Sequence, residues 1–99
     1  AIVTANNFIA LGAQQALDDR GIDIPGEISL ATFDDLPSHL NPRPFLTTVV
    51  QDPYAMGKEA AQRLIALLAD SAPHPIEDIV LPVHLVVRAS TAPPNQSSI

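Results

Sequence analysis

The sequence predicts an α/β fold built on a parallel sheet. Short apolar runs alternate along the chain with longer stretches of helical periodicity, and this order is typical of parallel strands joined by helices. The strand-like runs 1–5 and 28–33 enclose one helical pattern, so residues 2–33 form a β-α-β unit with a right-handed crossover. The second run is apolar on both faces, as in a strand covered by helices on two sides.

A helix is predicted over 8–20, directly after the first strand. Asn6 and Asn7 both suit its N-cap, and Gly21 is a stop signal. Gly12 costs about 1 kcal/mol relative to alanine inside a helix, which predicts close packing against another backbone. The face turned toward the core is predicted to carry Ile9, Ala13, Ala16 and Leu17.

The middle of the chain predicts a third strand and a second helix. Residues 34–45 hold two acids and three prolines and are predicted to be a loop, and the β-branched run 46–50 is the next strand. Asp52 and Pro53 then start a helix that runs to about Ala69, with Asp as the N-cap and Pro at the first helical position. Its apolar stripe comprises Met56, Ala60, Leu64, Leu67 and Leu68.

The last third of the chain predicts short strands and a tail. Pro73 and Pro75 interrupt the chain after the second helix, and two β-rich runs follow at 79–81 and 85–87. Residues 90–99 are mainly Ser, Thr, Pro, Asn and Gln, with too little apolar surface to fold. We therefore expect a mobile tail.

The composition restricts the partners of this segment. The formal net charge is −6, from 11 acids and 5 bases, and Lys and Arg dominate nucleic-acid binding, so we expect no DNA contact by this segment itself. No apolar run approaches the roughly 20 residues that span a bilayer, so we expect no membrane partner. The absence of cysteine excludes disulfides and thiolate metal sites and fits a cytoplasmic protein.

Catalysis receives little support from the residue types and their spacing. His39, His74 and His84 lack the spacing of metal ligands, so no metal site is predicted. The four glycines are isolated, which argues against a phosphate-binding loop. A Gly-x-Ser-x-Gly nucleophile motif is also absent from the sequence. We expect neither a cofactor nor an enzymatic activity.

Polar signatures stand where the predicted strands end: VTANN at 3–7, FDD at 33–35 and LTTVVQ at 46–51. Open α/β sheets bind small ligands just beyond the carboxyl ends of their parallel strands. The amide of Asn6 either caps the following helix or pairs with ligand hydroxyls. An Asp after a strand is usually a turn former, but Asp34 and Asp35 together create a local negative patch, which needs either solvent or another reason. Gln51 is either an ordinary exposed residue or a ligand contact.

The order and intervals of these signatures resemble the effector-binding core of the LacI/GalR (lactose-repressor) family of bacterial transcription regulators. The resemblance implies a parallel-sheet lobe of a type I periplasmic-binding-protein-like fold, truncated at the N-terminus. Residues 1–89 would be a C-terminal fragment of the effector-binding domain, followed by the flexible tail 90–99. Within that fragment, 1–50 would belong to the C-terminal lobe, 52–75 would cross into the N-terminal lobe, and 76–89 would be the return strands.

The same resemblance assigns roles to the polar residues at the strand ends. It implies that Asn6 and Asp34 reach the effector and that Gln51 lies near it, where the chain crosses between the lobes. A carboxylate there accepts hydrogen bonds from sugar hydroxyls or nucleobase N–H groups. Asp35 is expected to hold a loop or a neighbouring backbone. Asn7 stands where the family usually has Asp, which weakens any role for charge at that position.

The resemblance also implies partners beyond the small-molecule effector. The helix 8–20 and the loop 36–45 resemble the family's dimer-forming surface, with Ala10 and Leu11 either as contacts or as core residues. We expect a homodimer or higher oligomer, in part because the helix 53–69 would lack the sheet it packs on and expose its stripe. DNA would be bound only through an N-terminal helix-turn-helix outside this chain, which the effector would control by shifting the lobes between orientations.

Two other functions remain open from the sequence. A periplasmic solute receptor of a transport system shares the fold and would need a signal peptide upstream. A small Mg-dependent α/β enzyme or receiver domain could use Asp34 and Asp35 around the metal. That arrangement needs a further acid or a Lys after another strand, where Gln51 stands instead.

Overall fold

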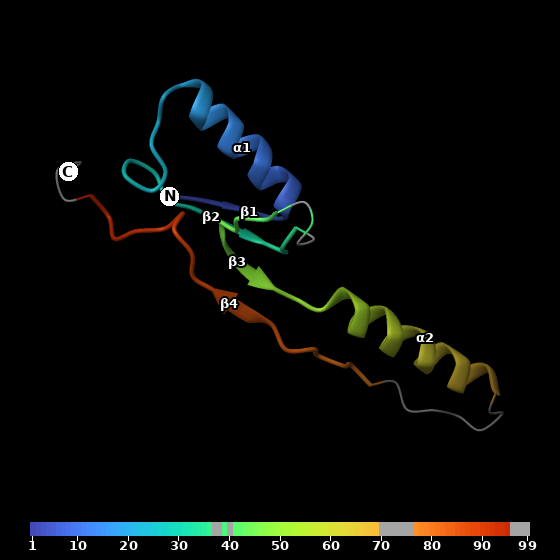
Figure 1. Cartoon of the computed structure of the whole chain (residues 1–99). Coiled ribbons are helices and arrows are strands. Elements are labelled where there is room, and N and C mark those ends of the chain that lie inside the picture. The colour runs from blue at the N-terminus through green and yellow to red at the C-terminus, as the bar shows by residue number, and fades with distance from the viewer. Residues whose placement is uncertain (37–38, 40, 70–76, 96–99) are drawn as a thin grey trace. The chain divides into compact units, whose positions relative to one another are not determined.

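The protein has an α/β fold, which confirms the fold class predicted from the sequence. The structure is a computed structural model that describes residues 1–36, 39, 41–69 and 77–95. Its described part contains one sheet with the strand order β1-β2-β3-β4 (Figure 1). Strands β1 (Ile2–Thr4), β2 (Leu30–Phe33) and β3 (Thr47–Val50) are parallel, and β4 (His84–Val86) pairs antiparallel with β3.

The chain divides into two compact units. The first comprises residues 1–50 together with the chain from His84 onward, and the second comprises Gln51–Val83. The sheet and helix α1 (Asn7–Asp19) belong to the first unit, and helix α2 (Pro53–Ala69) belongs to the second. The assignment of 1–50 and 52–75 to two lobes of a larger domain stays a prediction.

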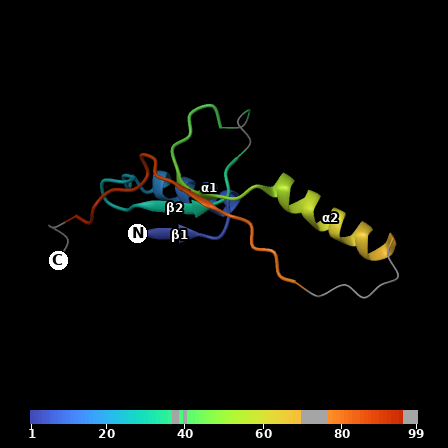
Figure 2. The same cartoon turned by 90° about the horizontal axis from the view of Figure 1, so that it is seen from below.

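In the first unit, α1 packs on one face of β1 and β2, where Figure 2 shows it behind the two strands. Ala10 and Leu17 of this helix are buried, as is Leu30 of β2. The core-facing side predicted from the sequence is partly wrong, because Ile9 is 52% exposed. The helix turns the small Ala10 toward the sheet instead. Residues 8–11 are all apolar and lie on every side of the first turns, so the sequence does not show which side of the helix is buried.

Both ends of α1 follow the predicted signals. Asn6 is the N-cap, and its side chain accepts a hydrogen bond of 2.9 Å from the Ile9 N–H. At the other end Gly21 has φ 67°, and the Gly21 and Ile22 amides donate to the carbonyls of Asp18 and Leu17. This is the Schellman pattern, in which the residue after the cap adopts the left-handed conformation that glycine tolerates best.

The close packing predicted at Gly12 is wrong. A Cβ atom at this position would meet no atom within 4 Å, so Gly12 lies beside open space. The glycine therefore weakens α1 without a packing contact in this structure to explain it.

Threonines form a buried row across the sheet. The register pairs Thr4 with Thr32 and Thr32 with Thr48, and all three are buried. The Thr4 hydroxyl donates to the Thr32 hydroxyl at 2.7 Å. Because the β1 and β2 ends are aligned by this register, the residues that follow them leave the sheet at the same level.

Ser90 is part of the core, although the sequence predicts that a mobile tail begins at this residue, and positions 96–99 of that tail lie outside the described residues. Ser90 is fully buried, its hydroxyl accepts from the Thr47 N–H at 2.8 Å, and it donates to the Leu30 carbonyl. Its own N–H donates to the Phe45 carbonyl, and its carbonyl accepts from the Leu30 N–H. Ser90 thus joins the amino ends of β2 and β3. The polar composition of residues 90–99 does not reveal this role.

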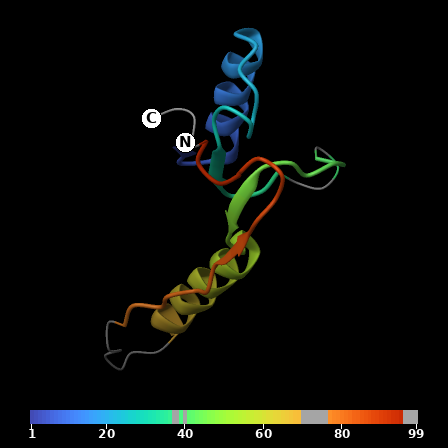
Figure 3. The same cartoon turned by 90° about the vertical axis from the view of Figure 1, so that its left-hand side faces the viewer.

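The second unit contains α2 with the bounds expected from the sequence. Asp52 caps this helix by accepting from the Ala55 N–H at 3.0 Å. None of its residues is buried, so the stripe of Met and Leu side chains is exposed, as anticipated. Arg63 of this helix lies 3.9 Å from Glu77 and 3.6 Å from Glu59. Figure 3 shows the segment 77–83 of the same unit running alongside the helix.

Only the second of the two predicted β-rich runs forms a strand. The run 85–87 corresponds to β4, which spans His84–Val86. The run 79–81 is not a strand, and Val80 in it is 90% exposed. β-branched residues favour a strand only where a neighbouring strand supplies hydrogen bonds and side-chain contacts, and within the described residues none pairs with 79–81.

Candidate functional site

The candidate site lies at the carboxyl ends of two parallel strands of the first unit. Asn6 follows β1, and Asp34 follows β2 directly. The structure therefore brings two of the three predicted ligand-binding residues to one edge of the sheet. The cap role of Asn6 is confirmed, and it engages the acceptor Oδ1 of the amide. The contact of Asn6 with a ligand stays a prediction.

Gln51 does not belong to this unit. It follows β3 in the sequence but begins the second unit, and its side chain is exposed. Its role in ligand binding also stays a prediction.

The backbone of Asp34 adopts an unusual conformation. Its φ of 69° is left-handed, and it is the one non-glycine residue of the described chain with a positive φ. For a residue with a Cβ this costs about 1–2 kcal/mol, so it persists only where neighbours fix it. The Asp34 N–H donates to the Val49 carbonyl at 2.9 Å, and its carbonyl accepts from the Thr48 hydroxyl at 2.9 Å. Strand β3 thereby holds both polar groups of the Asp34 backbone.

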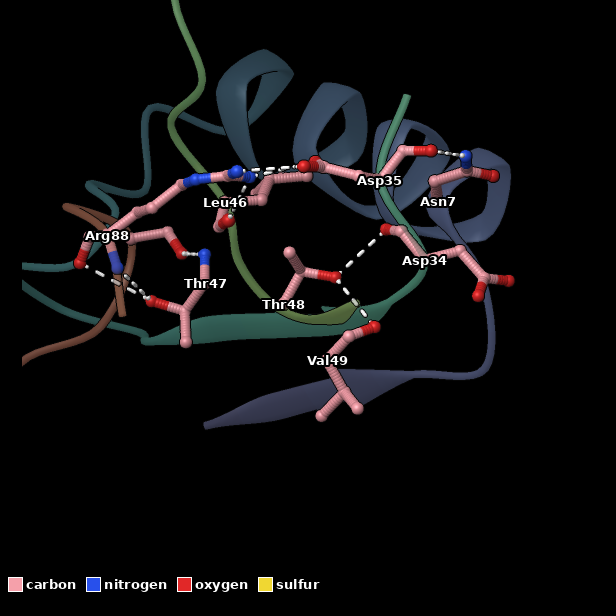
Figure 4. A network of polar contacts seen from close by, with 9 residues as sticks. Asn7, Asp34, Asp35, Leu46, Thr47, Thr48, Val49 and Arg88 are labelled. Carbon is pink, nitrogen blue, oxygen red and sulfur yellow. Dashed lines mark hydrogen bonds and ion pairs between the residues drawn. The ribbon is translucent and has the colours of Figure 1, made fainter. Parts of the chain in front are cut away.

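Asp35 makes a two-point ion pair with Arg88. Each carboxylate oxygen lies 2.8 Å from a different guanidinium nitrogen, and Nη1 also donates to the Leu46 carbonyl at 3.1 Å (Figure 4). The two side chains are 32% and 17% exposed, so the pair is partly shielded from water. Charged, two-point pairs of this geometry are among the stronger and more directional hydrogen-bonded contacts. Asp35 thus fixes the loop after β2 to the chain after β4.

Electrostatics favour the charged form of both partners. Hydrogen bonds from Arg88 hold the pKa of the Asp35 carboxyl below its usual value, although partial burial opposes this shift. The attraction of the guanidinium charge acts in the same direction as the hydrogen bonds. Hydrogen bonds to Asp35 in turn raise the pKa of Arg88. The pair is therefore ionised at neutral pH.

Asn7 ties the start of α1 to the same loop. Its Nδ2 donates to the Asp35 carbonyl at 3.1 Å. A carboxylate cannot donate this hydrogen bond, so the amide has a chemical role here that an Asp would not fill. Figure 4 shows the result, in which the Asp34 carboxylate points away from the Asp35–Arg88 pair.

Arg88 is the site residue that sequence reasoning misses. It lies two residues beyond β4 in an apolar stretch, at a separation of 53 residues from Asp35. The available signal is a cation within an apolar strand-like run, for which the two adjacent acids at 34–35 are candidate partners. Spacing along the chain does not show which acid it meets.

A small cavity of about 140 Å³ adjoins the two aspartates, with Asn7, Asp34, Asp35 and Arg43 in its lining. Pockets for small organic ligands are usually about 300–1,000 Å³. A cavity of this volume has room for only a few water molecules, so a sugar-sized ligand at Asp34 needs further walls.

The remaining predictions concern metals, membranes and dimer contacts. Among residues 1–36, 39, 41–69 and 77–95, no three His, Asp or Glu side chains gather where they could hold a metal ion. In that same part of the chain, none of the helices has both the length and the apolar character to cross a membrane. Ala10 is fully buried and therefore takes the core role left open for it, whereas Leu11 is 40% exposed.

Comparison with known proteins shows the family to which the chain belongs. The family described as periplasmic binding protein-like domain matches residues 1–91. The HTH-type transcriptional regulator GalR of Escherichia coli is 42% identical over 95 residues, which are 96% of this chain and 27% of that protein. The Lactose operon repressor of Klebsiella pneumoniae is 42% identical over 93 residues (94% and 26%), and the HTH-type transcriptional regulator MalR of Streptomyces coelicolor is 39% identical over 92 residues (93% and 26%). The chain thus spans about a quarter of the length of these relatives. No solved structure matches it.

Proposed function

Because this chain belongs to the periplasmic binding protein-like domain family, and within it to the LacI/GalR regulators, we propose that it is the C-terminal part of an effector-binding domain. The whole protein would be a cytoplasmic bacterial transcriptional regulator. Its effector would be a sugar or a nucleoside-like molecule, held in part by Asn6, Asp34 and Gln51.

One observation supports this proposal above the others. The Asp34 carboxylate stands at the carboxyl edge of the sheet on a backbone that β3 fixes, and it points away from the nearby cation Arg88. An ionised carboxylate at such an edge is suited to accept hydrogen bonds from paired hydroxyls or N–H groups of a ligand. The Asn6 amide at the neighbouring strand end would supply a donor from its Nδ2.

The chain would act on DNA through another part of the protein. Its net charge of −6 opposes contact with phosphates, so binding would depend on a DNA-binding segment outside these residues. An effector that prefers one orientation of the two lobes would shift the population toward it, and its differential affinity would set the size of the response.

The surface of α1 would contribute to a homodimer. Phe8 and Leu11 are 71% and 40% exposed and lie three residues apart on α1, so they form an apolar surface that a second copy could cover. Burying them against a second copy would remove this apolar area from water. Sedimentation of the full-length protein measures this directly, and a Leu11→Glu variant should shift it toward the monomer.

Substitution of Asp34 tests the proposed effector site. The full-length regulator would be titrated with D-galactose, lactose and adenosine while its release from, or recruitment to, a DNA site selected from a random library is followed by fluorescence anisotropy. We expect Asp34→Ala to abolish the response to the active compound and to leave DNA affinity without effector within about twofold.

The control is Asp78→Ala, which removes an exposed carboxylate of the second unit. An unchanged response in Asp34→Ala would remove Asp34 from the effector site. A protein that binds a sugar but no DNA sequence would instead be a solute receptor, and the regulator proposal would be wrong.

A further inference from the structure

The loop after β2 is held at more points than a surface loop requires. Strand β3 binds the N–H and the carbonyl of Asp34, and Asn7 binds the carbonyl of Asp35. These three hydrogen bonds come from two different elements. A fourth attachment, the ion pair with Arg88, comes from the chain beyond β4.

Arg88 is itself fixed before it reaches Asp35. Its backbone N–H donates to the Thr47 hydroxyl at 2.9 Å, and its carbonyl accepts from the same hydroxyl at 3.3 Å. Its guanidinium also donates to the Leu46 carbonyl. The side chain therefore presents a preset pair of donors to Asp35 and is not a long flexible arm that finds an acid at the surface.

Two adjacent carboxylates compete for any cation near them, but Asp35 is the one carboxylate among the hydrogen-bond partners described for the Arg88 side chain. Both oxygens of that carboxylate accept from the two terminal nitrogens of the guanidinium. Asp34 has the left-handed backbone and points away from the guanidinium (Figure 4). The ion pair with Arg88 therefore holds Asp35, whereas the Asp34 carboxylate is directed away from that pair.

We propose that Arg88 and Asp35 are positioning residues for the Asp34 carboxylate: their two-point ion pair holds Asp34 in its left-handed conformation and thereby fixes where its carboxylate stands at the strand-end site. The identity of the ligand in this inference rests on the proposed function. The effect of the ion pair on the Asp34 backbone does not depend on that function. Without the pair, Arg88 would turn to Asp34 or the loop would relax to an ordinary conformation. Either change withdraws the carboxylate from the strand-end site.

The test compares Arg88→Met, Arg88→Lys and Asp35→Asn in the full-length protein. The matched control is Arg63→Met, which removes an arginine from exposed ion pairs on α2. The first measurement, hydrogen–deuterium exchange of the peptide 33–36, needs no ligand. We expect at least tenfold faster exchange in Arg88→Met than in Arg63→Met, because the hydrogen bond from the Asp34 N–H to the Val49 carbonyl is no longer held in place.

The second measurement is the dissociation constant for D-galactose, lactose or adenosine, whichever the wild-type protein binds. We expect at least a tenfold loss in Arg88→Met and a smaller loss in Arg88→Lys, which keeps the charge but not the two-point geometry. The double variant of Asp35→Asn and Arg88→Met should bind no worse than either single variant. Partial rescue and non-additivity distinguish positioning from a general loss of stability.

Each outcome decides one of the two proposals. If the exchange of 33–36 is the same in Arg88→Met and Arg63→Met, the inference is overturned whether or not a ligand binds. If the exchange rises but Arg88→Met binds ligand within twofold of wild type, the pair fixes the loop without positioning Asp34 for the ligand, and the inference is again overturned. If exchange rises and the wild type binds none of the three compounds, the positioning of the Asp34 backbone stands and the proposed effector classes fail.

Discussion

Replacing Ser90 with alanine should destabilise the 99-residue chain by about 2 kcal/mol. The hydroxyl of this fully buried residue accepts from the Thr47 N–H and donates to the Leu30 carbonyl. Alanine keeps most of the volume but leaves the buried Thr47 donor without its partner, and such a group costs roughly 1–3 kcal/mol. The loss of the donor to Leu30 places the expected value in the middle of that range.

Urea unfolding followed by circular dichroism measures this change. With a slope of about 1.5 kcal/mol per molar urea, the midpoint should fall by about 1.3 M at an unchanged slope. The midpoint of thermal unfolding should fall by roughly 10 °C. Ser29→Ala is the control, because the exposed Ser29 hydroxyl bonds to Ala92 where water can replace it. A Ser90→Ala midpoint within about 0.3 M of the Ser29→Ala midpoint would refute this account of the buried hydroxyl.

Two further predictions use the same unfolding assay. Replacing Gly12 with alanine should stabilise the chain by about 0.5–1 kcal/mol, because the added Cβ meets open space in mid-helix. Replacing Gly21 with alanine should destabilise the chain by about 1–2 kcal/mol, because φ there is 67°. Equal signs at the two positions would contradict the left-handed cap. Asp35→Asn should be less stable than wild type at neutral pH, because the lowered pKa of Asp35 stabilises the folded state while its carboxyl is ionised. That stability difference should persist down to the unfolded-state pKa near 3.8 and vanish as the pH falls through the lower folded-state pKa; a difference that stays constant from pH 7 to pH 2 would contradict the ion pair.

The local elements follow from the sequence because their signals are local. The cap at Asn6, the stop at Gly21 and the start at Asp52 each depend on residues within one helical turn, and the structure has all three. The face of α1 and the failure of 79–81 to form a strand depend on what lies opposite, which periodicity does not encode.

The strand-end position of the site could be predicted, but its internal bonding could not. Parallel strands place Asn6 and Asp34 at one edge by topology alone. The pairing of Asp35 with Arg88 joins residues that are far apart in the chain. Their positions in the sequence do not show that the two side chains meet in space. The role of Ser90 could not be predicted for the same reason. A serine in a polar stretch is buried only when two strands offer it a donor and an acceptor.

The two connections between the units lie side by side, with a practical consequence for engineering. The chain leaves the sheet unit at Val50 and returns at His84, and these residues are direct partners in the β3–β4 ladder. Antiparallel partners have Cα atoms about 4.5–5.5 Å apart, a gap that a two-residue Asn-Gly turn closes. Residues 51–83 therefore form a cassette with adjoining ends. Excising it would turn β3 and β4 into a hairpin, and a foreign module with equally close termini could be installed at the same junction.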